Sequence, residues 1–159
     1  MSYRIVDGCT GCSRCAALCP VRAISGTIKQ PFLINEKRCV ECGVCARSCA
    51  KSVIVDRHGQ VPPLVPRKLW PVPIINSELC SACGICVDAC GMNALDISRP
   101  QYSGDYHVYA ILREVKKCVG CSLCVDECPL NAIKMEVCSR NFRAMLKLIL
   151  PTVKSVNMK

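Results

Sequence analysis

Aromatic side chains are scarce in this sequence: its 159 residues include one Trp, four Tyr and two Phe. No apolar run reaches the ~20 residues that a membrane-spanning helix needs, so we expect no integral membrane segment. The sequence also lacks a Gly-rich phosphate loop and a flavin or nicotinamide fingerprint. Its two histidines, His58 and His107, lie in a linker and in a loop, where we expect surface positions. We therefore predict no catalytic residue and no enzymatic activity of the chain itself.

Cysteine, in contrast, is abundant, and sixteen of the 17 cysteines fall into four copies of one spacing, C-x2-C-x2-C-x3-C. Thiolates at this spacing ligate [4Fe–4S] clusters. The pattern predicts four such clusters, with all sixteen cysteines binding iron. The four runs are Cys9-Cys12-Cys15-Cys19, Cys39-Cys42-Cys45-Cys49, Cys80-Cys83-Cys86-Cys90 and Cys118-Cys121-Cys124-Cys128. Cys138 belongs to no run, and we assign it no cluster role.

Disulfides and structural zinc are the alternative uses of so many cysteines. The odd count and the close spacing argue against disulfides, and three cysteines in series plus a fourth suit a cluster better than zinc. The start of the chain, MSYRIVDGCTGC, does not read as a secretory signal. We therefore expect a reducing, cytoplasmic environment.

The formal net charge of +9 suggests a nucleic-acid binder at first sight. However, ligating thiols are deprotonated, so a cluster with four thiolates carries about −2. Four clusters would reduce the net charge from +9 to about +1. We interpret the basic residues as compensation for cluster charge and as docking groups, and expect no nucleic-acid partner.

The repeat divides the chain into two small α+β modules with short strands and short helices, residues 1–57 and 74–137. A short apolar segment before the first run of each module and one after every run predict six strands. One or two helical turns should carry the last two cysteines of each run. Domains this small rarely build a sufficient core, so we expect the cluster-free chain to be largely unfolded. Residues 98–107 form an insertion that predicts a hairpin or surface loop.

Two segments lie outside the modules. The proline-rich arm, residues 58–73, includes Trp70; it is either a spacer or packs against the modules or a partner. The basic tail, residues 138–159, predicts an amphipathic helix from Ser139 to Leu150. This helix could bind a partner or a second copy, fold back on its own module, or lie on a membrane surface.

The motifs CTGCSRCAALCP, CVECGVCARSCA, CSACGICVDACG and CVGCSLCVDECP resemble those of bacterial two-[4Fe–4S] ferredoxins, twice over. In that family the fourth cysteine of each run binds the neighbouring cluster. The resemblance implies four ligand sets: Cys9, Cys12, Cys15 and Cys49; Cys39, Cys42, Cys45 and Cys19; Cys80, Cys83, Cys86 and Cys128; Cys118, Cys121, Cys124 and Cys90. Some four-cluster subunits instead pair the first run with the fourth and the second with the third, and the sequence leaves this alternative open.

The chain departs from the family pattern after two of the fourth cysteines. Pro20 and Pro129 match the family, but Ala50 and Gly91 replace the proline in the two inner runs. Both residues keep a backbone N–H that proline lacks. Because hydrogen bonds near cluster sulfurs change reduction potential, we expect the clusters to differ in potential.

The function that this resemblance implies is one-electron transfer by a polyferredoxin. The arm and tail favour a subunit bound to an oxidoreductase over a freely diffusing carrier. The chain looks like the small iron–sulfur subunits of anaerobic oxidoreductases, best of all that of a tungsten-dependent aldehyde oxidoreductase with tungstopterin and flavin subunits. Hydrogenase, formate dehydrogenase and aromatic-acyl-CoA reductase complexes, and filaments of the chain itself, remain alternatives. An iron–sulfur regulator or scaffold is the alternative of another class.

Overall fold

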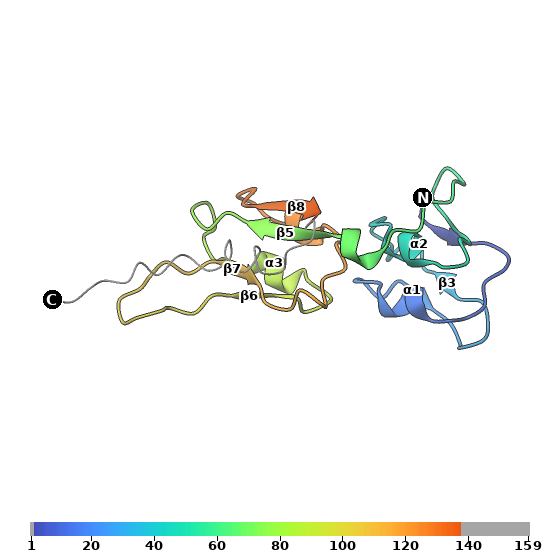
Figure 1. Ribbon diagram of the computed structural model, residues 1–159, viewed down its shortest axis with the longest axis horizontal. Coiled ribbons are helices and arrows are strands. Elements are labelled where there is room, and N and C mark those ends of the chain that lie inside the picture. The colour runs from blue at the N-terminus through green and yellow to red at the C-terminus, as the bar shows by residue number, and fades with distance from the viewer. Residues whose placement is uncertain (1, 138–159) are drawn as a thin grey trace.

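The computed structural model describes residues 2–137. These form an elongated molecule in which two modules follow one another along the long axis (Figure 1). Cys138 and the predicted helix at 139–150 lie outside the described residues. No helix among residues 2–137 has the length and apolar character to cross a membrane.

The first module contains four short strands and two short helices. Its elements are β1 (Arg4–Ile5), α1 (Arg14–Ala17), β2 (Ile24–Ser25), β3 (Leu33–Ile34), α2 (Val44–Ser48) and β4 (Ile54–Val55). Strand β1 pairs antiparallel with β4, with Arg4 opposite Val55, and β2 pairs antiparallel with β3. The first and last strands of the module therefore close it on itself.

The second module repeats this topology. After a 3-10 turn, η1 (Arg67–Leu69), its elements are β5 (Pro71–Ile75), α3 (Ile85–Asp88), β6 (Leu95–Ile97), β7 (Ala110–Leu112), α4 (Leu123–Asp126) and β8 (Ile133–Val137). Strand β5 pairs with β8 over five residues, and β6 pairs with β7. The insertion at 98–107 is the loop of the β6–β7 hairpin (Figure 1).

The helices of both modules are single turns that begin immediately after a residue of left-handed conformation. These preceding residues are Ser13, Gly43, Gly84 and Ser122, with φ of 60°, 70°, 81° and 68°. Helices of this length are not stable alone, so tertiary contacts must hold them. The sequence predicted these turns and six of the strands, but β3 and β7 were missed because two- and three-residue strands carry too little periodicity.

Each module has a small apolar core that packs directly against its cysteines. Ile24, Phe32 and Ile54 are buried in the first, and Leu95, Leu112 and Ile133 in the second. A core this small supplies little of the folding free energy. Much of the stability must therefore come from the groups bound by the cysteines.

A third buried cluster lies where the modules meet and contains Val44, Trp70 and Val119. The Trp70 side chain is 4% exposed, and its Nε1 donates a hydrogen bond to the Val65 carbonyl oxygen (2.9 Å). The Val65 amide in turn donates to the Arg47 carbonyl oxygen (2.9 Å). The end of the proline-rich arm thus packs between the modules and is more than a spacer.

Candidate iron–sulfur sites

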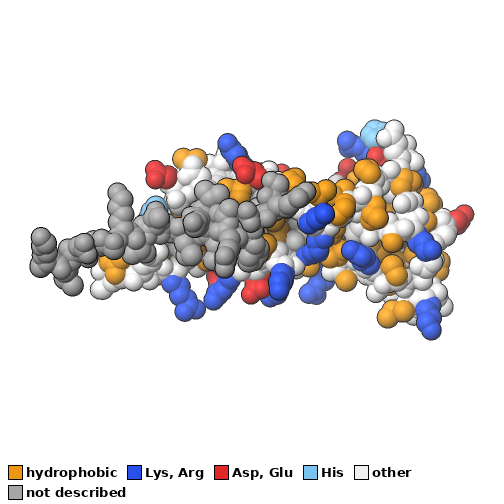
Figure 2. All heavy atoms as spheres, viewed as in Figure 1, with side chains coloured by type: hydrophobic (Ala, Val, Ile, Leu, Met, Phe, Trp, Pro, Cys, Tyr) orange, Lys and Arg blue, Asp and Glu red, His pale blue; other side chains and the backbone are white. Residues whose placement is uncertain are grey.

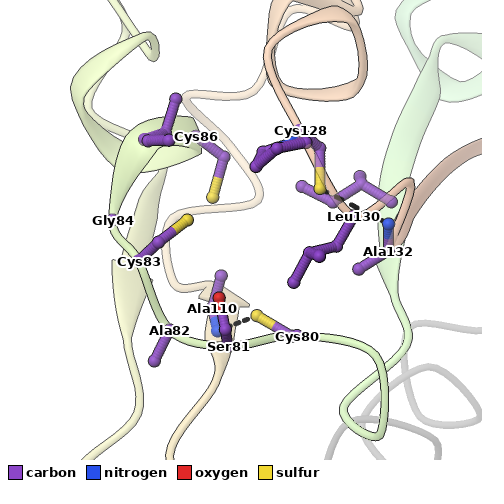
Figure 3. A pocket seen from close by; sticks show the side chains of 13 residues that line it. Cys80, Ser81, Ala82, Cys83, Gly84, Cys86, Ala110, Cys128, Leu130 and Ala132 are labelled. Atoms are coloured by element: carbon purple, nitrogen blue, oxygen red, sulfur yellow. Dashed lines mark hydrogen bonds between the residues drawn. The ribbon is translucent and has the colours of Figure 1, made fainter.

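Four cavities in the structure are each lined by four cysteines. Site 1 has Cys9, Cys12, Cys15 and Cys49; site 2 has Cys19, Cys39, Cys42 and Cys45; site 3 has Cys80, Cys83, Cys86 and Cys128; site 4 has Cys90, Cys118, Cys121 and Cys124. In site 3 the side chains of Cys80, Cys83, Cys86 and Cys128 face one cavity (Figure 3). The structure therefore brings together the same sets that the ferredoxin resemblance implies.

Each cavity combines three cysteines of one run with the fourth cysteine of the adjacent run. The first and second runs share sites 1 and 2, and the third and fourth runs share sites 3 and 4. Thiolates ringed around a cavity can each bind a separate iron of a cubane, so the residues present fit a [4Fe–4S] cluster in every site.

Two residues of positive φ let each run curl around its cavity, one on either side of the second cysteine. In the first run these are Gly11 (φ 66°) and Ser13 (φ 60°), which flank Cys12. A Cβ at Gly11 would lie 2.4 Å from the Gln30 backbone nitrogen, so glycine is required there by space as well as by conformation. The other three runs repeat the pattern with Glu41 and Gly43, Ala82 and Gly84, and Gly120 and Ser122.

Backbone amides donate hydrogen bonds to several of the cysteine sulfurs. The amide four residues after the last cysteine of a run does so three times: Ala23 to Cys19 (3.2 Å), Ala94 to Cys90 (3.3 Å) and Ala132 to Cys128 (3.4 Å). A further bond runs from the Ala110 amide to Cys80 Sγ (3.3 Å; Figure 3). Such bonds stabilise a thiolate and tune the potential of the cluster that it binds.

Burial opposes ionisation of cysteines in the first turn of the short helices. Burial first, and nearby thiolates in addition, raise the pKa of Cys15 to about 11 and of Cys45 and Cys124 to about 12. Without iron these thiols keep their protons at neutral pH. Iron must therefore displace a proton from each of them when it binds.

The Gly91 amide forms no hydrogen bond to a cysteine sulfur of the described residues. It donates to the Ala89 carbonyl oxygen (3.1 Å) instead. A Cβ at Gly91 would lie 1.9 Å from the Pro20 carbonyl oxygen of the first module. The glycine is needed because the two modules touch at this point, a cause that only the tertiary structure reveals.

Charge interactions among the cysteines indicate which sites are neighbours. Cys15 of site 1 contributes to the raised pKa of Cys45 in site 2, after burial and nearer groups, and Cys86 of site 3 does the same for Cys124 in site 4. The two modules meet through sites 2 and 4, since Cys42 and Cys121 both pack against the buried cluster of Val44, Trp70 and Val119. After burial, Cys121 also contributes to the raised pKa of Cys42.

The cysteines of sites 1 and 3 differ in solvent exposure from those of sites 2 and 4. Cys12 in site 1 and Cys83 in site 3 are exposed, whereas the eight cysteines of sites 2 and 4 are buried or half-buried. The sites with a solvent-facing thiol therefore stand at the two ends of the series 1, 2, 4, 3.

The sequence reasoning missed Arg47, which lies between sites 2 and 4. Burial lowers its pKa, and the thiolates of Cys42, Cys121 and Cys118 act in the opposite direction. A signal was available in the sequence: the second run has Arg47 where the other runs have Ala17, Asp88 and Asp126.

Four cavities ringed by cysteine sulfurs define an iron–sulfur protein. Comparison with known proteins shows to which family of iron–sulfur proteins the chain belongs. Residues 8–54 and 79–132 each match a 4Fe–4S dicluster domain. The chain is 45% identical over 42 residues to ferredoxin-2 of Chlorobaculum tepidum, a match that covers 26% of this chain and 66% of the relative.

Among solved structures, the chain is similar to one in a formate dehydrogenase–heterodisulfide reductase–formylmethanofuran dehydrogenase complex from Methanospirillum hungatei. That match has 23% identity and a TM-score of 0.32, and it covers 80% of this chain and 52% of the other. The two domain matches together span more than half of the sequence. The chain is thus a tandem of two 4Fe–4S dicluster domains of the bacterial ferredoxin type, with sites for four [4Fe–4S] clusters.

Proposed function

We propose that this chain is a non-catalytic electron-transfer subunit that relays single electrons through its four iron–sulfur sites. The observation that carries the proposal is the set of four cavities, each with a complete ring of four cysteines. When bound, [4Fe–4S] clusters supply one-electron carriers. The sixteen cysteines act as the iron ligands in the grouping given above, and the two modules correspond to residues 1–57 and 74–137.

The order of the relay is site 1, site 2, site 4, site 3. The charge interactions within each module and the one between Cys42 and Cys121 support this order. The exposed thiols of Cys12 and Cys83 support the two outer sites as the points of exchange with redox partners.

The proposed partner is a catalytic oxidoreductase subunit in the cytoplasm, containing tungstopterin and acting on aldehydes, with a flavin subunit or a ferredoxin at the other end. The resemblance of the sequence to small iron–sulfur subunits supports this choice. The complete ligand rings favour a relay over a regulator, which would need a labile cluster. The arm and tail favour a bound subunit over a diffusing polyferredoxin.

Anaerobic purification of the intact protein from its native source tests the partner. We expect a catalytic subunit to copurify, with tungsten found by metal analysis. Molybdenum, nickel–iron or acyl-CoA-reducing partners would instead indicate the formate dehydrogenase, hydrogenase or aromatic-acyl-CoA reductase complexes. Purification of the chain alone would indicate a diffusing carrier, and copurified nucleic acid would contradict the relay.

Reductive titration of the purified chain tests the relay itself. We expect sixteen irons per chain and uptake of four electrons, followed by EPR as the reduced clusters become paramagnetic. Uptake of fewer electrons at full iron content would contradict the proposal.

We also propose self-association through residues 58–73 and 139–159, which would extend the row of sites into a filament. Removal of residues 139–159 should then shorten the assemblies in mass photometry without loss of iron. An unchanged size distribution would contradict it.

A further inference from the structure

Arg47 connects the two modules at the point where sites 2 and 4 are nearest. It lies on α2 between two cysteines of the second run, and its Nη2 donates hydrogen bonds to the carbonyl oxygens of Val119 (2.5 Å) and Gly120 (2.7 Å). Those two residues stand between the first two cysteines of the fourth run. The guanidinium also lies 4.9 Å from the centre of the Trp70 ring. One side chain from the site 2 run therefore holds the backbone loop of site 4.

One hydrogen-bond donor of Arg47 has no protein partner. Its Nε is buried and, among residues 2–137, is the one buried side-chain nitrogen or oxygen without a hydrogen bond. A buried unpaired donor on a charged group is costly, and in native proteins such a group usually has an acceptor that a protein-only structure does not contain.

Sulfur is the acceptor that a bound cluster would supply here, since no cysteine Sγ of residues 2–137 accepts a hydrogen bond from Nε. The thiolates of Cys42, from site 2, and of Cys121, from site 4, are the two strongest charge interactions of the guanidinium. Both cysteines also pack against the buried junction cluster of Val44, Trp70 and Val119. A cluster bound in either site would bring further sulfur atoms close to the same junction.

We propose that Arg47 donates its Nε–H to a sulfur at this junction and raises the reduction potentials of sites 2 and 4 above those of sites 1 and 3. The proposal rests on the proposed iron–sulfur relay. A fixed positive charge and an N–H···S hydrogen bond both favour the reduced cluster, which carries one more negative charge. Because Arg47 is half-buried, solvent and salt screen its charge only in part. The relay would then hold electrons on its two inner sites, away from the exposed ends.

Arg67 provides a matched control. Its guanidinium lies at the same distance from the Trp70 ring (4.9 Å), and its Nη2 donates to the carbonyl oxygens of Lys116 (2.5 Å) and Cys118 (3.3 Å). Unlike Arg47, it is exposed. Arg67 therefore has the same charge, a similar contact with Trp70 and similar hydrogen bonds to backbone carbonyl oxygens. However, solvent screens its charge, and it has no buried nitrogen without a hydrogen bond.

Potentiometric EPR titrations of the intact, iron-loaded protein test the proposal with Arg47→Gln, Arg47→Lys and Arg67→Gln. We expect Arg47→Gln to lower the one-electron reduction constants of two of the four clusters about tenfold, or about 59 mV each. Arg47→Lys keeps the charge but loses Nε, so its shift should be intermediate; Arg67→Gln should shift all four midpoints much less.

Iron content and total electron uptake, measured on the same samples, separate the two proposals. Sixteen irons and four electrons with unmoved midpoints in Arg47→Gln would overturn the role of Arg47 and leave the relay intact. Equal shifts of all four midpoints, or an equal effect of Arg67→Gln, would also overturn it. Failure of the wild-type protein to bind four clusters would instead overturn the relay.

A measurement on the wild-type chain avoids dependence on variant folding. Arginine labelled with ¹⁵N at Nε should give a hyperfine coupling to a reduced cluster in pulsed EPR, as expected for an N–H···S hydrogen bond. The absence of that coupling in fully loaded wild-type protein would overturn the proposal, whatever the variants do.

Discussion

At the scale of single residues, the cysteines face two opposed demands. Burial among apolar neighbours raises the thiol pKa values of Cys15, Cys45 and Cys124, whereas iron binds only the thiolate. Backbone N–H groups aimed at sulfurs such as Cys19 Sγ favour the ionised form. The sites are therefore organised for a bound anionic cluster and are poorly suited to free thiolates.

Cluster loading should therefore accelerate as pH rises. In the folded chain the thiols with raised pKa values are protonated at pH 7, and the thiolate fraction of each rises with pH, reaching one half at its pKa of about 11 or 12. We expect more iron bound per chain after a fixed time of anaerobic reconstitution at pH 9 than at pH 7, measured by iron assay. Free iron and sulfide must be matched between samples. Equal loading rates at the two pH values would contradict this interpretation.

At the scale of elements, no helix or strand within residues 2–137 is stable by itself. The α-helices have four or five residues and the strands two to five, so their geometry depends on the cysteine loops that they frame. The arm differs from the other elements because its Trp70 side chain is buried and contacts the guanidinium groups of Arg47 and Arg67. That residue makes the arm a structural part of the junction.

Trp70→Ala should therefore destabilise the junction. Truncation of a buried Trp costs about 3–5 kcal/mol, and here it also removes the hydrogen bond to the Val65 carbonyl oxygen and both arginine contacts. We expect a lower thermal midpoint of the iron-loaded protein in circular dichroism. Leu64→Ala, on the same arm but 55% exposed, should change stability by less than about 0.5 kcal/mol. Equal effects of the two substitutions would show that the arm does not pack as described.

At the scale of the whole molecule, the two modules form one row of sites because sites 2 and 4 face each other across the junction. Lys and Arg side chains are visible over the waist between the modules (Figure 2), where positive charge can offset that of two adjacent anionic clusters. The closeness of the modules is also visible at Gly91, which abuts the Pro20 carbonyl oxygen.

Gly91→Ala should force the modules apart. The added methyl group would lie 1.9 Å from the Pro20 carbonyl oxygen, and such overpacking costs about 1–3 kcal/mol. We expect a lower thermal midpoint and weaker magnetic coupling between the inner clusters in EPR. Ala50→Ser, at the corresponding exposed position of the second run, should change neither. A wild-type midpoint in Gly91→Ala would exclude the close contact.

Removal of iron should proceed from the ends of the row. Cys12 and Cys83 are exposed and belong to the outer sites, so a chelator reaches those sites first. We expect native mass spectrometry during slow chelation to show an intermediate that keeps two clusters, and circular dichroism to show unfolding when those are lost. Loss of all four clusters in one step, or retention of the outer ones, would contradict the order.

The sequence by itself determined the cofactor and the local folds around it. Four repeats of one cysteine spacing specify the ligands, because each tight loop and the helical turn after it are built from neighbouring residues. It also determined that the modules would have small cores, since so few aromatic and large apolar side chains are available to fill them.

Only the tertiary structure decided how the modules meet. The contacts of Arg47 with Val119 and Gly120, and of Gly91 with Pro20, join residues about 70 positions apart. No periodicity links such positions, because their pairing depends on the packing of two surfaces that each module completes separately. The pattern of runs predicted four sites, but the order in which they stand and the arginine between the inner two follow from that packing.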